Sequence, residues 1–411
     1  MNNQDLIGVF SFTFTHIIEE WFEPYGLVIR SYTIEISICS TLARGGRYMK
    51  CAHCDYSNPR GLTFCLNCEH EFTSGDNTQQ DSNSLFYEFA QLVDGVPMSH
   101  RSVKPKFRNI FSRVFRKHSD MEAERLFIVG TSLTTPKIEE VVATWPKPWL
   151  FTRVFLIALL AYLGLFIGVS LFGNINFVPG LIVVGAFAVP FTTLIFFWEM
   201  NAPQNIAIYK IVYVVFIGGI LSLLVAVVFY DILRNNINPV TIGVVEELSK
   251  VVAVIFFVRP LKYKFVLNGL LLGAAIGAGF AAFETAGYAL RALLSDSFHM
   301  LYTTILWRSV FSPGGHVAWA ALTGAAICMV QGDSKFQINM LFKPKFILIF
   351  ALVVSMHALW DAPLLGIYPF GQIILMVVSW VFVFLMIRIG LKEISDKKNR
   401  LTLTRNSNYG P

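Results

Sequence analysis

The chain has 411 residues, of which 55% are hydrophobic and only 15% are charged, and its mean hydropathy is +0.56. This composition, with its long uncharged runs, excludes an ordinary soluble globular protein and predicts a polytopic membrane protein. The net charge of +6 therefore bears on the orientation of the chain in a membrane, and we expect no binding to nucleic acid.

Residues 1–48 resemble nothing later in the chain. The start, from Met1 to Asp5, is not basic and no long apolar core follows, so no cleavable signal peptide is predicted. The run Arg44-Gly45-Gly46-Arg47 precedes Met49, and purine-rich codons for that run would suit a ribosome-binding site. Our hypothesis is that Met49 is the native start of a prokaryotic gene and that residues 1–48 are a translated leader or disordered.

Residues 49–72 contain two Cys-x-x-Cys pairs. This spacing places four thiolates around one Zn²⁺, and a shell of four cysteines leaves no position open for chemistry. We therefore expect a structural zinc ribbon in a reducing compartment, whereas the alternative, a redox-active dithiol, would not need a second pair. The predicted ligands are Cys51, Cys54, Cys65 and Cys68.

Residues 73–148 are predicted to form a cytoplasmic linker that starts with a polar, Ser/Asn/Gln/Asp-rich stretch. Residues 101–117 then carry seven Lys and Arg and no acid, with aromatic and aliphatic side chains at helical spacing. This pattern predicts a basic amphipathic helix on an anionic membrane surface, and a solvated, disordered basic segment is the alternative. Trp145 and Trp149 bring the chain to the membrane interface.

Apolar segments then follow one another through residues 149–390, and a basic tail occupies 391–411. About 20 residues cross a bilayer as a helix, so the expected fold is an all-α bundle of about eight transmembrane helices, preceded by the small zinc ribbon. The segments are 154–172, 177–198, 211–230, 239–258, 265–290, 316–330, 346–360 and 370–387.

Lys and Arg mark one side of this predicted bundle. They precede the first segment and follow the fourth, sixth and eighth, whereas the connections after the first and seventh segments have none. The positive-inside rule then places both termini in the cytoplasm of a multi-pass protein, which we assign to a prokaryotic plasma membrane.

Polar residues recur on four of the predicted segments. A charged side chain in the middle of a membrane costs about 2.5–3.5 kcal/mol, so such residues need partners. With the predicted orientation the carboxylates and imidazoles lie in the outer third of the membrane, and scattered structural groups would have no reason to share one depth. The residues are Glu246, Glu247 and Lys250 on the fourth segment, Glu284 and Tyr288 on the fifth, His316 on the sixth, and His357 and Asp361 on the seventh.

One alternative is purely structural: the charged groups neutralise one another between packed helices. Otherwise, such a cluster suits three kinds of chemistry. A carboxylate can take a proton from water while an imidazole assists a leaving amine, which is hydrolysis. Glu246, Glu284, His316 and His357 can instead serve as metal ligands or base of a metal-dependent protease. A non-catalytic proton or cation-coupled transporter or sensor is the third possibility, but the chain shows no internal repeat.

Taken in order along the chain, the motifs Glu246-Glu-x-x-Lys, Phe283-Glu-x-x-x-Tyr, an isolated His316 and His357-x-x-x-Asp resemble those of the PrsW family of intramembrane proteases. That family lies within the wider group of CAAX-processing and bacteriocin-processing membrane proteases. The resemblance covers about residues 149–390. It implies hydrolysis of a peptide bond of a membrane protein near the outer membrane surface, with an anti-sigma factor or similar regulator as the kind of substrate that some members cut.

The resemblance also implies roles for individual residues. The first Glu of the pair activates water in the CAAX relatives, which makes Glu246 the base, Glu247 its orienting partner and Lys250 their counter-charge. His357 and Asp361 match the His and Asn positions of those relatives. The chain departs from them at Glu284, where they have His, and this departure leaves open whether a catalytic metal is bound.

The fifth segment carries Gly269, Gly273 and Gly277 at intervals of four residues. Such a small-residue face lets two membrane helices approach closely, so we expect it to serve helix packing rather than substrate binding.

The expected partners follow from these interpretations. They are the lipid bilayer, a membrane-protein substrate and a cytoplasmic protein that the zinc ribbon recruits.

Overall fold

The structure is a computed structural model that describes residues 48–50, 57–59, 110–233, 237–258, 263–295, 297–362 and 369–407. Two short strands, β1 (Tyr48–Lys50) and β2 (Ser57–Pro59), pair in a two-stranded sheet. The four cysteines of the predicted zinc ribbon, the predicted leader before Tyr48 and the linker before Ile110 lie outside the described residues.

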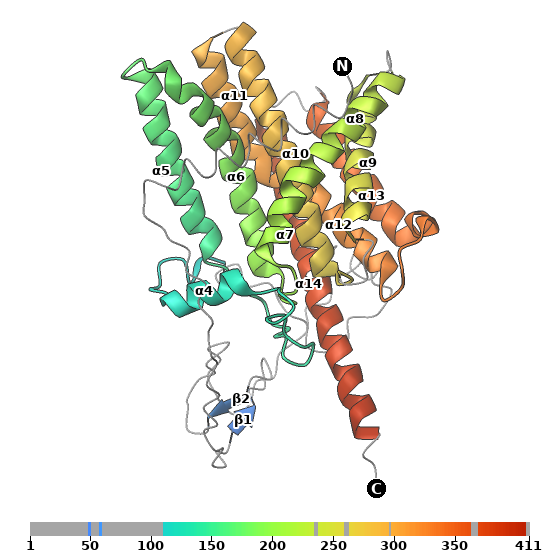
Figure 1. The fold of residues 1–411 in the computed structure, drawn as a ribbon. Helices are drawn as coiled ribbons and strands as arrows, with labels where there is room; N and C mark the ends of the chain where they lie inside the picture. The colour runs from blue at the N-terminus through green and yellow to red at the C-terminus, as the bar shows by residue number, and fades with distance from the viewer. Residues whose placement is uncertain are drawn as a thin grey trace, which may run out of the picture. The chain divides into compact units, whose positions relative to one another are not determined.

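The described part of the linker does not continue the predicted amphipathic helix. Helical structure ends at Phe111, and the chain then turns where the sequence pattern predicts a helix as far as Lys117. Arg153 explains the change, because its side chain donates hydrogen bonds to the carbonyl oxygens of Val114 and Arg116 and so holds them in the turn. The next helix, α4 (Asp120–Ile128), starts at the N-cap Ser119 and lies across the ends of the neighbouring long helices rather than along them (Figure 1).

The remaining chain forms a bundle of long helices (Figure 1). Among the described residues, seven helical elements are long and apolar enough to cross a membrane, which confirms the predicted all-α polytopic fold. They comprise α5 (Leu150–Ser170), η2 (Ile175–Phe177) with α6 (Val178–Met200), α7 (Ile208–Tyr213) with η3 (Val214–Gly218) and α8 (Gly219–Leu233), α10 (Val266–Ser295), α11 (Phe298–Phe311) with η4 (Ser312–Gly314) and α12 (His316–Gln331), α13 (Pro344–Asp361), and α14 (Phe370–Ser407).

The helix α9 (Pro239–Val258) has the length of a membrane span but carries three charged residues. The short helix η5 (Ile338–Phe342) precedes α13. The bounds of α9 are those predicted from the sequence.

The sixth predicted segment is part of a longer, broken element. The chain breaks at η4 and the N-cap Gly315, where α11 precedes the break and α12 follows it. Together they run from Phe298 to Gln331, so α11 supplies the length that residues 316–330 lack. His316 therefore lies at a break in the middle of a crossing element rather than at its end.

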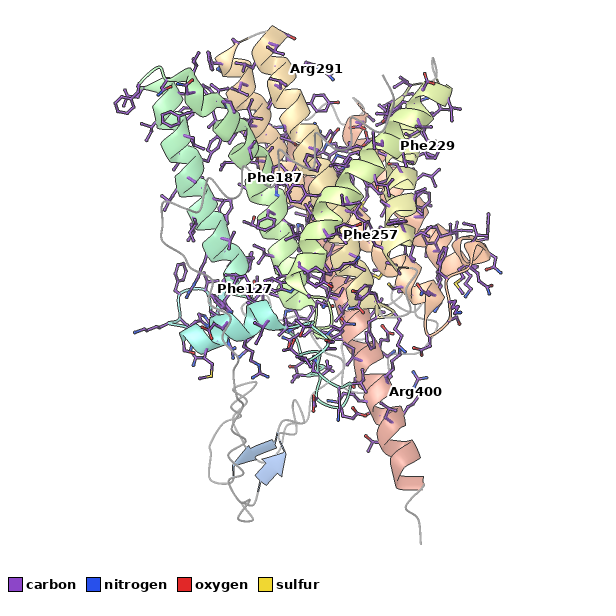
Figure 2. All side chains as sticks on the ribbon, viewed as in Figure 1. Phe127, Phe187, Phe229, Phe257, Arg291 and Arg400 are labelled. Carbon is purple, nitrogen blue, oxygen red and sulfur yellow. The ribbon has the colours of Figure 1, made fainter. Side chains whose placement is uncertain are left out.

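The last helix extends beyond the predicted span. α14 has 38 residues, which corresponds to about 57 Å at 1.5 Å per residue and exceeds a hydrocarbon core of about 30 Å. Its C-terminal part is charged, and Figure 2 shows Arg400 at the same end of the bundle as Phe127, with Arg291 towards the opposite end.

Candidate active site

Helix α9 presents one face to the bundle and the other outward. The side chains of Val240, Val244, Leu248, Val252 and Phe256 recur every four residues and are between 37% and 59% exposed. The face between these positions turns inward, where Glu247 and Lys250 are completely buried and Glu246 is 8% exposed. The apolar stripe that fits lipid thus fixes the direction in which the charged residues point.

Two of these charged residues form a buried network with α13. The Nζ atom of Lys250 donates a hydrogen bond to Oε1 of Glu247 at 2.7 Å. The same oxygen lies 2.7 Å from Nδ1 of His357. In a neutral imidazole, an Nδ1–H of His357 that donates to Glu247 leaves Nε2 without a proton.

A second histidine arrives on α12. Nε2 of His316 lies 3.1 Å from Oε2 of Glu284 on α10, and its Nδ1 lies 2.9 Å from Nζ of Lys250. A lysine ammonium can only donate, so Nδ1 of His316 is the acceptor and Nε2–H donates to Glu284. Each histidine therefore gives its proton to a carboxylate and has one unprotonated nitrogen.

Both unprotonated nitrogens face Glu246. Its Oε2 lies 3.6 Å from Nε2 of His357 and 4.0 Å from Nδ1 of His316. The other oxygen, Oε1, accepts a hydrogen bond of 3.0 Å from the hydroxyl of Tyr230 on α8. Within the part of the chain that the structure describes, Oε2 is buried and has no hydrogen-bond partner.

The packing of α10 against α12 sets this geometry. A Cβ atom added at Gly269, Gly273 or Gly277 would collide with the backbone of α12, so the glycine face serves close helix packing, as predicted. The atom that a Cβ at Gly277 would meet is the carbonyl oxygen of His316 itself. The last glycine of the face thus determines how near His316 comes to Glu284.

The predicted residues do not all join the central cluster. Asp361, at the end of α13, lies 3.5 Å from Nε2 of His357 and has the most exposed carboxylate of the group. Tyr288 instead lies beneath the guanidinium of Arg308, 4.3 Å from the centre of its ring. It therefore belongs to the periphery of the site.

Three further residues of the site were not predicted. Tyr230 contacts Glu246, whereas Arg308 contacts both Glu284 and Thr285. Arg308 could have been predicted from the sequence, because it is a charged residue in an otherwise apolar segment. Tyr230 could not have been predicted in this way, since tyrosines are common near the ends of membrane helices, at the interface with water.

When all of its carboxylates are ionised, the described cluster carries more negative than positive charge. Glu246, Glu247, Glu284 and Asp361 are its carboxylates, whereas Lys250 and Arg308 are its permanent cations. An excess of negative charge in a buried region favours the binding of a further cation.

Three side chains are close enough together to hold one metal ion. One ligand atom each from Glu246, His316 and His357 lie within 4.8 Å of one another. Histidines that bind metals generally donate their other N–H to a carboxylate or carbonyl, and here Glu247 and Glu284 are placed to accept it. Two His and one Glu form a catalytic Zn²⁺ donor set with a position left open, so the residues fit a metal centre.

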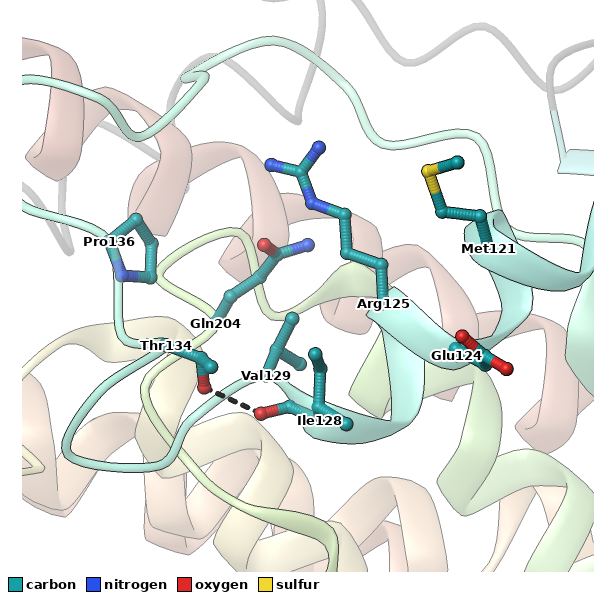
Figure 3. Close-up of a pocket in the computed structure, with 8 residues that line it drawn as sticks. All are labelled: Met121, Glu124, Arg125, Ile128, Val129, Thr134, Pro136 and Gln204. Carbon is teal, nitrogen blue, oxygen red and sulfur yellow. Dashed lines mark hydrogen bonds between the residues drawn. The ribbon is translucent and has the colours of Figure 1, made fainter. Parts of the chain in front are cut away.

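The cavity drawn in Figure 3 is a separate feature. It has a volume of about 390 Å³ and lies between α4 and the loop that follows α6. Its lining includes Arg125, Ile128 and Gln204, and none of the predicted site residues.

Comparison with protein families identifies one match. Residues 207–388 match the family model described as PrsW family intramembrane metalloprotease. The matched region contains every residue of the cluster, from Tyr230 to Asp361. Comparisons with curated proteins and with solved structures gave no match.

Proposed function

Residues 207–388 belong to the PrsW family of intramembrane metalloproteases, and on that premise we propose that Glu246, His316 and His357 form the metal centre at which a peptide bond of a membrane protein is hydrolysed. The observation that carries the proposal concerns Oε2 of Glu246. Among the described residues this buried oxygen has no hydrogen-bond partner, and one nitrogen of each histidine faces it. A divalent metal held by these three side chains would supply a Lewis acid for the substrate carbonyl and would make water a better nucleophile.

This proposal assigns Glu246 to metal binding, although the resemblance to CAAX enzymes implied that it is the base. The two roles use the same oxygen and have different consequences, because a base can be replaced by Gln without loss of metal. Tyr230 holds Oε1 and thereby aims Oε2 at the histidines. Lys250 offsets the charge of Glu247, which keeps Nδ1–H of His357 directed at that carboxylate.

Asp361 is then the carboxylate that accepts the proton. Glu247 and Glu284 are each held by a cation and a histidine. Among the described residues, Asp361 forms its ion pair with His357. Its side chain is 30% exposed, so water and substrate can reach it. As water attacks the carbonyl carbon, Asp361 takes the proton and afterwards gives it to the amide nitrogen as the carbon–nitrogen bond breaks.

The access side follows from exposure along the helices. The side chains of Glu247 and Lys250 are fully buried, that of Glu284 is 16% exposed and that of Asp361 is 30% exposed. Asp361 is the last residue of α13, so the site opens towards the end of the bundle at which α13 ends.

Basic side chains mark the opposite end of the bundle. Lys264 and Lys343 lie just before the starts of α10 and α13. Lys397 lies in the C-terminal part of α14 and shares the carboxylate of Asp333 with Lys264. By the positive-inside rule that side is cytoplasmic, which supports cleavage on the outer side of the membrane. We therefore propose single-span membrane proteins, such as an anti-sigma factor, as substrates.

The test compares membrane-protein fragments released by cells that produce the wild type or Glu246→Gln. We expect fragments with new N-termini on the outer side of their span in the wild type, and none of these in the variant. A variant that releases the same fragments would contradict the assignment of the site. Cuts on the cytoplasmic side would contradict the orientation alone.

Metal content separates the two roles of Glu246. If Glu246 is a ligand, Glu246→Gln loses bound metal together with activity, whereas Asp361→Asn retains the metal and loses about 10²–10⁴-fold in turnover, the usual contribution of general-base catalysis. An inactive Glu246→Gln protein with full metal content would instead assign Glu246 as the base.

A further inference from the structure

Helix α11 carries a cation, Arg308, on the face that packs against the site. Leu301 and Ile305 are almost fully buried, and Arg308 follows them at the spacing of one helix face. The side chain of Arg308 is 30% exposed, and an arginine within a membrane bundle is costly unless its charged group has partners. This position therefore requires an anionic or polar group on the helix against which α11 packs.

The partners of Arg308 all lie on one turn of α10. Its Nη2 donates a hydrogen bond to Oε2 of Glu284, and its Nε donates to the hydroxyl of Thr285 at 3.1 Å. Its guanidinium also covers the ring of Tyr288. A planar guanidinium makes these three contacts at once, which a lysine ammonium cannot do.

The depth of Arg308 in the bundle is fixed from the other side. The hydroxyl of Ser309 donates to the carbonyl oxygen of Gly185 on α6 at 2.9 Å. A Cβ atom at Gly185 would collide with the side chain of Ile305, so α11 and α6 are in close contact there. Arg308 is therefore held in one position by the packing of α11, unlike a mobile charge on the surface.

A single carboxylate, that of Glu284, links Arg308 to the proposed metal centre. Oε2 of Glu284 receives Arg308 and also lies 3.1 Å from Nε2 of His316. A carboxylate held in this way accepts Nε2–H of His316 and keeps the ring oriented with Nδ1 towards Glu246.

We infer that Arg308 is a positioning residue that orients His316 for metal binding through Glu284. This inference rests on the proposed metal centre. It adds a function for α11, a helix that carries none of the predicted site residues.

The test measures Co²⁺ binding to the full chain, because Co²⁺ reports on ligand geometry through its visible spectrum. The double variant His316→Ala/His357→Ala serves as the reference and corrects for any Co²⁺ bound at the cysteine pairs. We expect Arg308→Met to weaken the site by up to about 10–100-fold, the effect of losing Glu284 as the outer partner of a metal ligand, and Arg308→Lys to restore part of the affinity.

Arg291→Met is the matched control. Arg291 also lies over the ring of Tyr288, at 5.2 Å, and is exposed on the same helix as Glu284. We expect its loss to leave Co²⁺ affinity unchanged, which separates the Glu284 contact from a general effect of positive charge near the tyrosine.

Arg308→Met protein that is folded by circular dichroism and binds Co²⁺ with wild-type affinity would overturn the inference. If Arg308→Met does not fold, Arg308→Lys and Thr285→Val decide the question, since both must weaken Co²⁺ binding. If the wild type binds no more Co²⁺ than the double histidine variant, the proposed metal centre itself fails.

Discussion

Replacing Gly277 by alanine should disable the site through helix packing alone. The added Cβ would lie 2.9 Å from Cβ of Ala320, whereas carbon atoms pack at about 3.5–4.0 Å. α10 and α12 must therefore separate by about 1 Å next to His316. Such overpacking costs about 1–3 kcal/mol of stability, and a 1 Å displacement of a catalytic group lowers turnover by about 10²-fold.

Two other glycines of α10 serve as controls. A Cβ at Gly273 also collides with the α12 backbone, but one turn further from His316, whereas a Cβ at Gly287 has no neighbour within 4 Å. We expect Gly273→Ala to lose similar stability and much less activity. Gly287→Ala should keep its activity and gain up to about 1 kcal/mol from helix propensity.

The assay combines thermal unfolding in detergent with cleavage of a reconstituted membrane substrate, corrected for the folded fraction. If Gly277→Ala has wild-type stability and turnover, close packing at this glycine does not place His316. If Gly273→Ala loses as much activity as Gly277→Ala, the effect is a general loss of packing rather than a displacement of the histidine.

Three further changes have defined outcomes. Tyr230→Phe removes one hydrogen bond to the central carboxylate, and cleavage assays should show turnover lower by about 10-fold or more, since such bonds to charged groups contribute about 1.5–3 kcal/mol. Lys250→Met leaves the buried Glu247 without its cation, and thermal unfolding should show a loss of about 3–5 kcal/mol. The hydrogen bond from Lys264 lowers the pKa of Asp333, so its contribution to stability is present above the ordinary pKa of Asp and is lost as the pH falls through the lowered value. Asp333→Asn should therefore flatten the acid end of the stability profile.

The sequence predicted the elements that lipid and charge determine directly. The bounds of α9 were correct because its apolar face has the length of a membrane span and a proline starts it. The cluster of Glu246, His316 and His357 was predictable for a related reason. Charged residues in apolar helices must meet partners, and the motifs on successive helices provide them.

The remaining features depend on which helices are neighbours. Tyr230 meets Glu246 only because α8 packs beside α9, and Arg308 meets Glu284 only because α11 folds back along α10. No periodicity along one helix contains this information. The extension of α14 to Ser407 was missed for another reason, since its charged end has no hydropathy signal.

The depth of the site also differs from the simple expectation. Glu284 was placed near the outer end of its span, but α10 continues to Ser295, about 16 Å further at 1.5 Å per residue. α11 runs alongside that extension before the chain reaches His316. Sequence windows of about 20 residues could not reveal this, because they treat each span as equally long.

The metal content of the purified full-length chain, measured by elemental analysis beside the His316→Ala/His357→Ala variant, tests the metal centre most directly. We expect the wild type to hold one more divalent metal ion per chain than the double variant, and only the wild type to cleave membrane proteins. Equal metal contents in the two proteins, with cleavage retained by the wild type, would contradict the claim that these histidines and Glu246 form the metal centre.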